Sequence, residues 1–219
     1  KSLKSITIPK GISVLPVYFC GSATSLEEVI FHPGIREIKD NAFRNCSSLT
    51  SIAIGDSIAS IGSYAFSGCS RLTEVVIPNS VTSIGLRAFS GCSSLTSVIW
   101  NAKNCSDYLS YAYAPFYNSS SITSFTFGEN VEIIPAYLCS GITSLSTITI
   151  PTNITNIGQE AFSLCSSLTS IFWNAKNCTS PSSYAESPFY GISSQITSFS
   201  IGENIKIIPA YLCCGMKSL

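Results

Sequence analysis

The residues of this sequence that could carry out chemistry are ten cysteines and a single histidine, His32. A thiol beside an imidazole can act as a nucleophile with its base, and a cluster of such side chains can hold zinc. A catalytic pair would have to join His32 to Cys46, whose position recurs along the chain and is expected to be buried. Too few ligands lie at the spacing of a metal site. The sequence therefore favours a protein without thiol catalysis, metal or cofactor, and we expect His32 to be a solvated turn residue.

Most of the cysteines recur at two fixed positions of a repeating unit. Seven do so: Cys46, Cys69, Cys92 and Cys165 at one position, and Cys20, Cys139 and Cys213 at the other. Equivalent residues of stacked units lie about 4.8 Å apart, within reach of a disulfide, but their Cβ bonds run parallel instead of converging. We therefore favour free, buried thiols over disulfides. The state of Cys105, Cys178 and Cys214, including a bond between Cys213 and Cys214, stays open.

The repeating unit is clearest from residue 72 to residue 94, LTEVVIPNSVTSIGLRAFSGCSS. Shifted back by 23 residues, it falls on LTSIAIGDSIASIGSYAFSGCSR, and similar units cover nearly the whole chain. Self-similarity at such a period is typical of solenoids, because one unit cannot bury its apolar side alone. The sequence therefore predicts a single solenoid domain over residues 1–219. We number its coils 1 to 9 by their first residues, Leu3, Leu26, Leu49, Leu72, Leu95, Ile122, Leu145, Leu168 and Ile196.

Seven coils are 23 residues long, whereas the lengthened coils 5 and 8 have 27 and 28 residues. Counted from the first residue of a coil, positions 1, 4 and 6 are apolar, as in Leu72, Val75 and Ile77, and this alternation predicts a strand. Pro or Gly at position 7 ends it. Apolar positions 10 and 13 predict a second short strand, and the following Ala-Phe-x-x-Cys has the spacing of one helical turn. We expect a parallel sheet on one face, with short strands and helical turns on the other.

The composition excludes several kinds of partner. Twelve Lys and Arg balance twelve Asp and Glu, and no basic stripe is present, so binding of nucleic acid is not expected. No apolar run is long enough to cross a bilayer, so this segment is not expected to insert into a membrane. The chain begins and ends inside repeats without the polar end caps of natural arrays, which indicates a fragment of a longer protein.

The pattern L-x-x-I-x-I-P-x-x-V-x-x-I-G-x-x-A-F-x-x-C resembles the leucine-rich repeats of the BspA-like family, over essentially the whole chain. The Trp-Asn-Ala-Lys-Asn segments of coils 5 and 8 and the Pro-Ala-Tyr-Leu-Cys segments resemble variants from gut and oral Bacteroidetes. This resemblance implies a non-enzymatic surface or secreted protein of an anaerobic bacterium. It also implies binding, which in some members is to host matrix proteins such as fibronectin and fibrinogen.

One departure from the general leucine-rich pattern concerns position 9, where Asn usually satisfies backbone groups of the turn. Asn130, Asn153 and Asn204 stand there, but Ser57 and Ser80 do so in other coils. We therefore expect no continuous ladder of asparagines.

The outward face of the predicted sheet is a first candidate binding surface. Apolar residues at position 5 form a stripe along the stack. Most residues at positions 2 and 3 carry hydroxyl groups, and carboxylates lie beside the stripe. The candidates are Ile30, Ala53, Val76, Ile99 and Phe172, with Glu28 and Glu74. Such residues could form a flat patch for a protein partner. They could equally be there because β-branched residues favour the surface of a sheet.

The tyrosines of the lengthened coils are a second candidate surface. They are Tyr108, Tyr111, Tyr113 and Tyr117 in coil 5, and Tyr184 and Tyr190 in coil 8. The two groups would lie about 15 Å apart on one side, and aromatic protrusions can anchor proteins or stack on sugars. The alternative, which we favour, is that Phe116 and Phe189 fill the wider core and the tyrosines cover it. Trp100 and Trp173, at inward positions, are assigned to the core.

Three functions are compatible with these features. We favour a non-enzymatic adhesion module of a cell-surface or extracellular protein that binds a protein, such as host matrix, or a glycan. The first alternative is a structural spacer or scaffold within a larger surface protein. A thiol-based enzyme is the least favoured.

Overall fold

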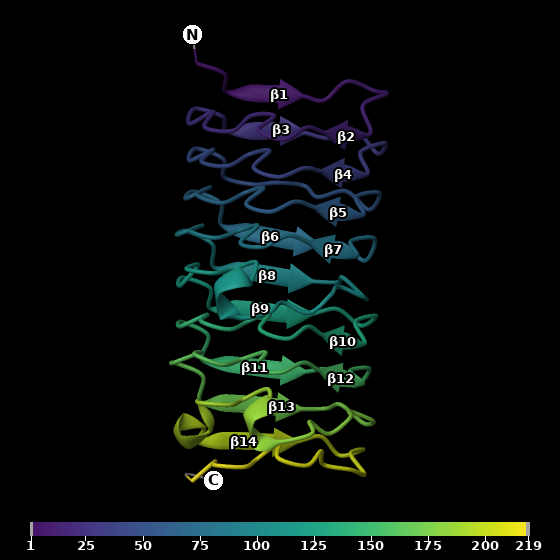
Figure 1. The fold of residues 1–219 in the computed structure, drawn as a ribbon, viewed down its shortest axis with the longest axis vertical. Helices are drawn as coiled ribbons and strands as arrows, with labels where there is room; N and C mark the ends of the chain where they lie inside the picture. Colours follow the sequence, from purple (N-terminus) through teal and green to yellow (C-terminus); the bar gives the residue numbers. More distant parts are fainter. Residues whose placement is uncertain (1, 218–219) are drawn as a thin grey trace.

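The computed structural model describes residues 2–217, which form an elongated stack of coils with the two ends of the chain at opposite ends (Figure 1). Every strand pairing in this described part is parallel. Parallel pairing between successive turns arises because each coil repeats the path of the one before it. The class of fold, a leucine-rich-repeat solenoid with parallel sheets, is as the sequence predicted.

The first strands of the coils lie on one face of the stack. They are β1 (Ser5–Thr7), β3 (Glu28–Ile30), β6 (Glu74–Ile77), β8 (Ser97–Trp100), β9 (Ser124–Phe127), β11 (Thr147–Ile150), β13 (Ser170–Trp173) and β14 (Ser198–Ile201). Three separate sheets result, in the orders β1-β3, β6-β8-β9 and β11-β13-β14. The register joins identical coil positions, as in Val76 opposite Ile99. We call this face the first sheet face.

The second strands are only two residues long and lie beyond the turn that follows position 7. They are β2 (Val14–Leu15), β4 (Glu37–Ile38), β5 (Ser60–Ile61), β7 (Ser83–Ile84), β10 (Ile133–Ile134) and β12 (Asn156–Ile157). The first four form one sheet and the last two another, with lengthened coil 5 between them. The solenoid has about seven turns, slightly fewer than the nine predicted coils. Among the described residues, coil 3 has no first strand, and coils 5, 8 and 9 have no second strand.

The Ala-Phe-x-x-Cys segments form turns, so the prediction of a helical turn there was wrong. Residues such as Asn45 and Tyr64 adopt positive φ values of 59° and 56°. Their turns leave backbone groups free to bond to the next coil, as in the Phe43 N–H that donates to the Ala65 carbonyl at 2.7 Å. In an α-helix these N–H groups would instead bond to carbonyls within the same segment. The helices present are 3₁₀ turns of the lengthened coils: η1 (Tyr111–Tyr113), η2 (Tyr184–Glu186) and η3 (Ser193–Gln195).

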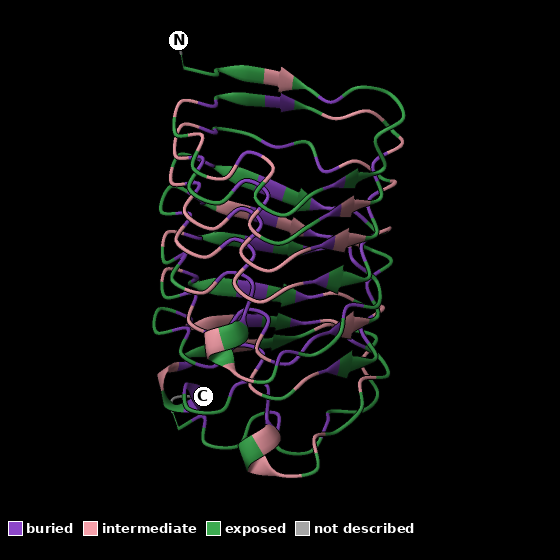
Figure 2. Cartoon of the chain, turned by 45° about the horizontal axis from the view of Figure 1, so that its top comes forward, coloured by how far each residue is buried: buried purple, intermediate pink, exposed green. Residues whose placement is uncertain are grey.

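The core is a column of identical side chains stacked from coil to coil. Phe66 lies between Phe43 and Phe89, with ring centroids 5.4 and 5.2 Å apart and nearly parallel rings. Phe116 and Phe189 are buried, as predicted, and so are the two tryptophans. Buried segments follow the inner side of each coil and exposed residues the outer turns (Figure 2). Burial of positions 1, 4 and 6 is clearest in coil 4, where all three side chains are at most 1% exposed.

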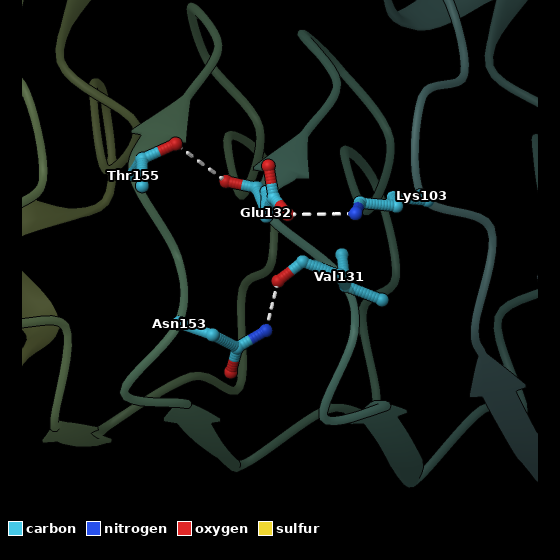
Figure 3. A network of polar contacts seen from close by, with 5 residues as sticks. All are labelled: Lys103, Val131, Glu132, Asn153 and Thr155. Atoms are coloured by element: carbon cyan, nitrogen blue, oxygen red, sulfur yellow. Dashed lines mark hydrogen bonds and ion pairs between the residues drawn. The ribbon is translucent and has the colours of Figure 1, made fainter.

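Side chains at position 9 bond the turn between the first and second strands to the preceding coil, and different residue types do so. The Ser57 and Ser80 hydroxyls donate to the carbonyls of Ile35 and Ile58 in the preceding coils, at 2.9 and 2.7 Å. Asn153 does the same with its side-chain amide, which donates to the Val131 carbonyl (Figure 3). Serine thus replaces asparagine in the same contact, and the ladder is mixed.

Candidate functional site

The apolar candidates of position 5 point out of the first sheet face, because positions 4 and 6 on either side point into the core. Ile30, Val76 and Phe172 have 45%, 38% and 44% of their surface exposed. Ala53 is also exposed, and Ile99 is half-buried beside Val76. Phe172 stands apart, since its neighbours in register are the hydroxyl residues of the adjoining coils. The structure therefore brings Val76 and Ile99 together and places Ile30 and Phe172 at a distance from them along the stack.

The candidate carboxylates Glu28 and Glu74 are both exposed on this face. Ser5 of the preceding coil donates a hydrogen bond to Glu28 at 3.3 Å, and Glu74 lies opposite Ser97 in the register. They belong to different sheets and form no pair with each other. Their arrangement suits contact with a basic partner and offers no acid and base for catalysis.

The first strands are unpaired at three junctions that the sequence did not reveal, between coils 2 and 3, coils 3 and 4, and coils 6 and 7. Residues 51–55 of coil 3 form no strand and pair with neither β3 nor β6, and β9 does not pair with β11 (Figure 1). A cavity of about 630 Å³ lies between coils 2 and 3, and one of about 270 Å³ lies between β9 and β11. The second strands stay paired at all three junctions, as β4 with β5, β5 with β7 and β10 with β12. The coils are therefore held together on one face and parted on the other.

Proline stands at position 7 at two of the three unpaired junctions, but not at the junction of coils 2 and 3, where Gly55 does. Where the first sheet is paired, the position 7 N–H donates to the position 6 carbonyl of the preceding coil, as Asn101 does to Ile77 at 2.8 Å. Pro78 and Pro151 occupy position 7 where coil 4 meets coil 3 and where coil 7 meets coil 6. Proline has no N–H, so it removes this bond from the ladder. The sequence held this signal, but its effect on the neighbouring coil becomes visible only once the register is known.

The tyrosines of coil 5 divide into two groups. Tyr111 and Tyr113, on η1, are each 45% exposed. The half-buried Tyr117 lies 6.0 Å from the Tyr111 ring, and the Arg87 guanidinium lies 4.3 Å from the Tyr117 ring centroid. The Arg87 Nε also donates to the Ala112 carbonyl at 2.7 Å, so this arginine fixes η1 against coil 4. Two of these side chains are thus available to a ligand on a supported platform.

Tyr108 does not belong to this platform, and its prediction as a protruding residue was wrong. It is only 8% exposed, and its hydroxyl has no hydrogen-bond partner among the described residues. Burial, with a smaller effect of nearby Cys105, raises the pKa of Tyr108 well above its ordinary value. In coil 8, Tyr190 is 38% exposed and packs at 5.3 Å against the half-buried Tyr184.

The cysteines of the core are free and act as hydrogen-bond donors to the backbone. The Cys46 thiol donates to the Cys20 carbonyl at 3.1 Å, and Cys165 repeats this contact with Cys139. Burial raises the pKa of Cys46 to about 11 and that of Cys165 to about 12. Such thiols stay protonated at neutral pH and are poor nucleophiles.

The cysteines of the last coil differ from this pattern. Cys213, assigned by its position to the core, is exposed together with Cys214. Coil 9 is the last coil described, and no further coil covers its lower side in the described residues. Cys105 is buried and Cys178 half-buried, both as free thiols.

The single histidine is more enclosed than a turn residue in water. His32 is half-buried, and its Nδ1 accepts a hydrogen bond from the Gly34 N–H at 2.9 Å. Its Nε2 has no partner among the described residues. Cys46 is bonded elsewhere, so the structure does not bring the two together as a catalytic pair. Within residues 2–217, no three His, Cys, Asp or Glu side chains are grouped closely enough to hold a metal ion. No helix in this part is long and apolar enough to span a bilayer.

The stacked coils and the exposed face of parallel strands define a leucine-rich-repeat β-solenoid. The family model for the BspA type leucine rich repeat region matches residues 1–115 and 110–219, in six copies. The chain therefore belongs to the BspA type leucine-rich-repeat family, as its repeat motif predicted.

Two solved structures, from Bacteroides ovatus and T. pallidum, support the fold. A leucine-rich repeat protein from Bacteroides ovatus ATCC 8483 is 22% identical to this chain, with a TM-score of 0.53. The match covers 98% of this chain and 65% of the B. ovatus chain. The leucine-rich repeat protein of T. pallidum is 20% identical with a TM-score of 0.51, over 97% of this chain and 78% of its own. A leucine rich cell surface protein from Faecalibacterium prausnitzii A2-165 is 22% identical with a TM-score of 0.48, over 91% and 60%.

The chain spans less than two thirds of the length of the B. ovatus and F. prausnitzii proteins. No curated protein matches it at significant similarity.

Proposed function

We propose that this chain is a non-enzymatic protein-binding module of a cell-surface or extracellular protein, with the first sheet face as its contact surface. The observation that carries the proposal is the outward exposure of Ile30, Val76 and Phe172, by 38% to 45%. Water-exposed apolar side chains of this size lose unfavourable hydration when a partner covers them. The preference of β-branched residues for the surface of a sheet explains Ile30 and Val76. It does not explain the carboxylates Glu28 and Glu74, which stand two residues before them.

The rigidity of the face supports the same function. Except in coil 3, its side chains project from strands whose backbone is bonded to at least one neighbouring coil, so little conformational entropy is lost when a partner binds. The central pair, Val76 and Ile99, is held in register by β6 and β8. A contact at the centre of an interface, from which a partner excludes water, contributes more to binding energy than the contacts at its rim.

The class of partner we propose is an extracellular protein, such as a host matrix protein. The family to which the chain belongs and the description of the F. prausnitzii protein as a cell surface protein are consistent with this location. A glycan partner would be expected to use the exposed tyrosines of η1 instead, since sugars stack on aromatic rings.

The test is binding of the immobilised chain to fibronectin, fibrinogen, mucins and a glycan array. The variant carries Glu in place of Ile30, Val76 and Ile99. We expect binding to one matrix protein, reduced about 30-fold or more in the variant, which corresponds to the ~2 kcal/mol of one central contact.

The matched control carries Glu in place of Val17, Leu109 and Leu164, which are 53%, 87% and 52% exposed and lie outside the first strands. It introduces the same charge and should bind as the parent chain does. Equal losses in both variants would show a general effect of charge and contradict the proposed surface. Binding to nothing would favour the scaffold function.

A further inference from the structure

The opening between coils 2 and 3 leaves two facing backbone edges without partners. In the paired part of the first sheet, backbone groups of one coil bond to the next, as Ser97 N–H does to the Thr73 carbonyl. The same groups are unbonded here, in the part of the chain that the structure describes. They are the N–H groups of Val29, Phe31, Ser51, Ala53 and Gly55, and the carbonyls of Glu27, Val29, Phe31, Ser51 and Ala53.

The space between these edges is built into the fold. Coils 2 and 3 remain joined through β4 and β5 and through the Phe43 turn, so the opening is confined to the first sheet face. A Cβ atom built on Gly55 would meet nothing within 4 Å, whereas one on Gly128, at a paired junction, would collide with Asn101. The cavity of this opening, about 630 Å³, is larger than the one of about 440 Å³ beside Ile54, Val76 and Pro78 and the one of about 270 Å³ between β9 and β11.

We propose that this opening binds an extended segment of a partner polypeptide by β-strand addition. This inference rests on the proposed function, since it names how part of a protein partner is held. An extended backbone supplies alternating donors and acceptors at the spacing of a strand edge, and unpaired edges are a template for such pairing.

The side chains around the opening indicate what the segment carries. Glu28 lies at one end and Asp56 at the other, and no Lys or Arg lines the cavity. The two carboxylates are five coil positions apart, about 16 Å along a strand, so basic residues at that spacing match them. Ser51 and Ala53 are small and admit a close backbone, while Ile30 offers an apolar contact.

Other occupants fit less well. A glycan would need an exposed aromatic platform, but the only aromatic carbocycle in the wall is the half-buried Phe31, which packs on Phe43 at 6.1 Å. The wall also contains the buried Nε2 atom of His32, which has no hydrogen-bond partner among the described residues. A backbone group of a bound segment can supply that partner.

The probe is the fluorescently labelled peptide acetyl-Lys-Val-Thr-Ile-Thr-Lys-amide, with binding measured by anisotropy on the full chain. One control peptide has the same side chains but N-methyl groups on alternate amides, and a second has Glu for both Lys. We expect the N-methyl peptide to bind about 10-fold or more weakly, because two or three backbone hydrogen bonds are lost. The Glu peptide should bind least.

Two protein variants separate backbone pairing from side-chain contact. Ala53→Pro removes an N–H that bonds to nothing in the free chain, and it should weaken peptide binding about 10-fold. Ala53→Val keeps the N–H and should still bind. Hydrogen exchange adds a direct readout: the amides of Ser51, Ala53 and Gly55 should exchange rapidly in the free chain and become protected by the peptide.

Several results would overturn the inference. Amides 51, 53 and 55 that are already protected would mean a closed sheet in solution, and protection that appears only as the chain dimerises would identify a second copy as the occupant. Absence of peptide binding, or equal binding of the N-methyl peptide, would exclude strand addition. A Val76→Glu/Ile99→Glu variant tests the proposed function separately: if it loses the matrix protein while Ala53→Pro does not, the sheet surface stands and strand addition fails.

Discussion

The phenylalanines that follow alanine in the short coils hold neighbouring coils together. Phe89 is fully buried and stacks between Phe66 at 5.2 Å and Phe116 at 5.5 Å. Each ring thus contributes to two interfaces between coils, where most of the stability of a solenoid resides.

We expect Phe89→Ala to lower the free energy of unfolding by about 3 to 5 kcal/mol, because it leaves a cavity between two coils that cannot collapse. Urea denaturation followed by circular dichroism measures this change. The matched control is Phe172→Ala, which removes an outward ring that is 44% exposed and should cost less than about 1 kcal/mol. A cost for Phe89→Ala no greater than for the control would contradict the inward position of the ring.

Individual side chains could be predicted from the sequence where the repeat defines their register. Val76 and Ile99 were placed outward and Phe89 inward because each has equivalents in other coils. Tyr108 and Tyr111 lie in a stretch that the short coils lack. Tyr111 has one equivalent, Tyr184 of coil 8, and Tyr108 has none, since Pro181 stands there. Nothing in the residue type distinguishes the buried ring from the exposed one. Cys213 has an equivalent, but its burial depends on a neighbouring coil and not on its own position.

Arg87 connects an element of coil 5 to coil 4 and so supports the exposed tyrosines. Its guanidinium covers the Tyr117 ring and its Nε donates to the Ala112 carbonyl within η1. The helix η1 lies in the insertion that interrupts the second strands, so no strand pairing holds it in the described part of the chain, although the Arg87 backbone N–H also donates to the Tyr113 carbonyl at 3.3 Å.

We expect Arg87→Ala to cost about 1 to 2 kcal/mol through the lost ring contact and hydrogen bond, and to increase hydrogen exchange in residues 111–117. Arg87→Lys should restore little of this, because a lysine ammonium lacks the planar group that stacks on a ring while donating from Nε. The two variants are compared by thermal denaturation and exchange mass spectrometry. Full rescue by lysine would mean that charge alone holds η1.

At the level of elements, the sequence predicted the strands well and their connections less well. Alternation at positions 4 to 6 and apolar residues at positions 10 and 13 gave both ladders of strands. The turn at Ala-Phe-x-x-Cys was mistaken for a helix because its spacing suits both, and only bonding to the next coil decides between them. Pro78 and Pro151 were interpreted as ends of strands, but each also removes one hydrogen bond to the preceding coil, at a junction where the first strands are unpaired.

At the scale of the whole molecule, each coil forms one layer of the stack and repeats the contacts of the coil before it. Strand registers pair identical positions throughout, and the turns repeat the same contacts from coil to coil. Each layer contacts only its neighbours, so stability is a sum over layers and interfaces.

We expect that removal of residues 49–94, two complete coils, leaves a folded protein whose long axis is about 10 Å shorter. Coil 5 would then follow coil 2 in the same register. Small-angle scattering measures the length, and circular dichroism measures the strand content. Removal of residues 61–94, one and a half coils, is the control, since it brings unlike positions together and should prevent folding. If both deletions unfold the chain, the layers are not interchangeable.

The direction of the hydrogen bonds has a mechanical consequence. Bonds between coils run along the long axis of the stack, so tension applied at the two ends would load them in series and open them one row at a time (Figure 1). Most junctions are joined by strands on one face only: by second strands between coils 2 and 3, 3 and 4, and 6 and 7, and by first strands around the lengthened coils 5 and 8. We expect these to yield before the junction of coils 1 and 2, which is paired on both faces. The solenoid would lengthen in steps of about one coil, as a brittle spring does, and its weakest joints would set the load that it can transmit.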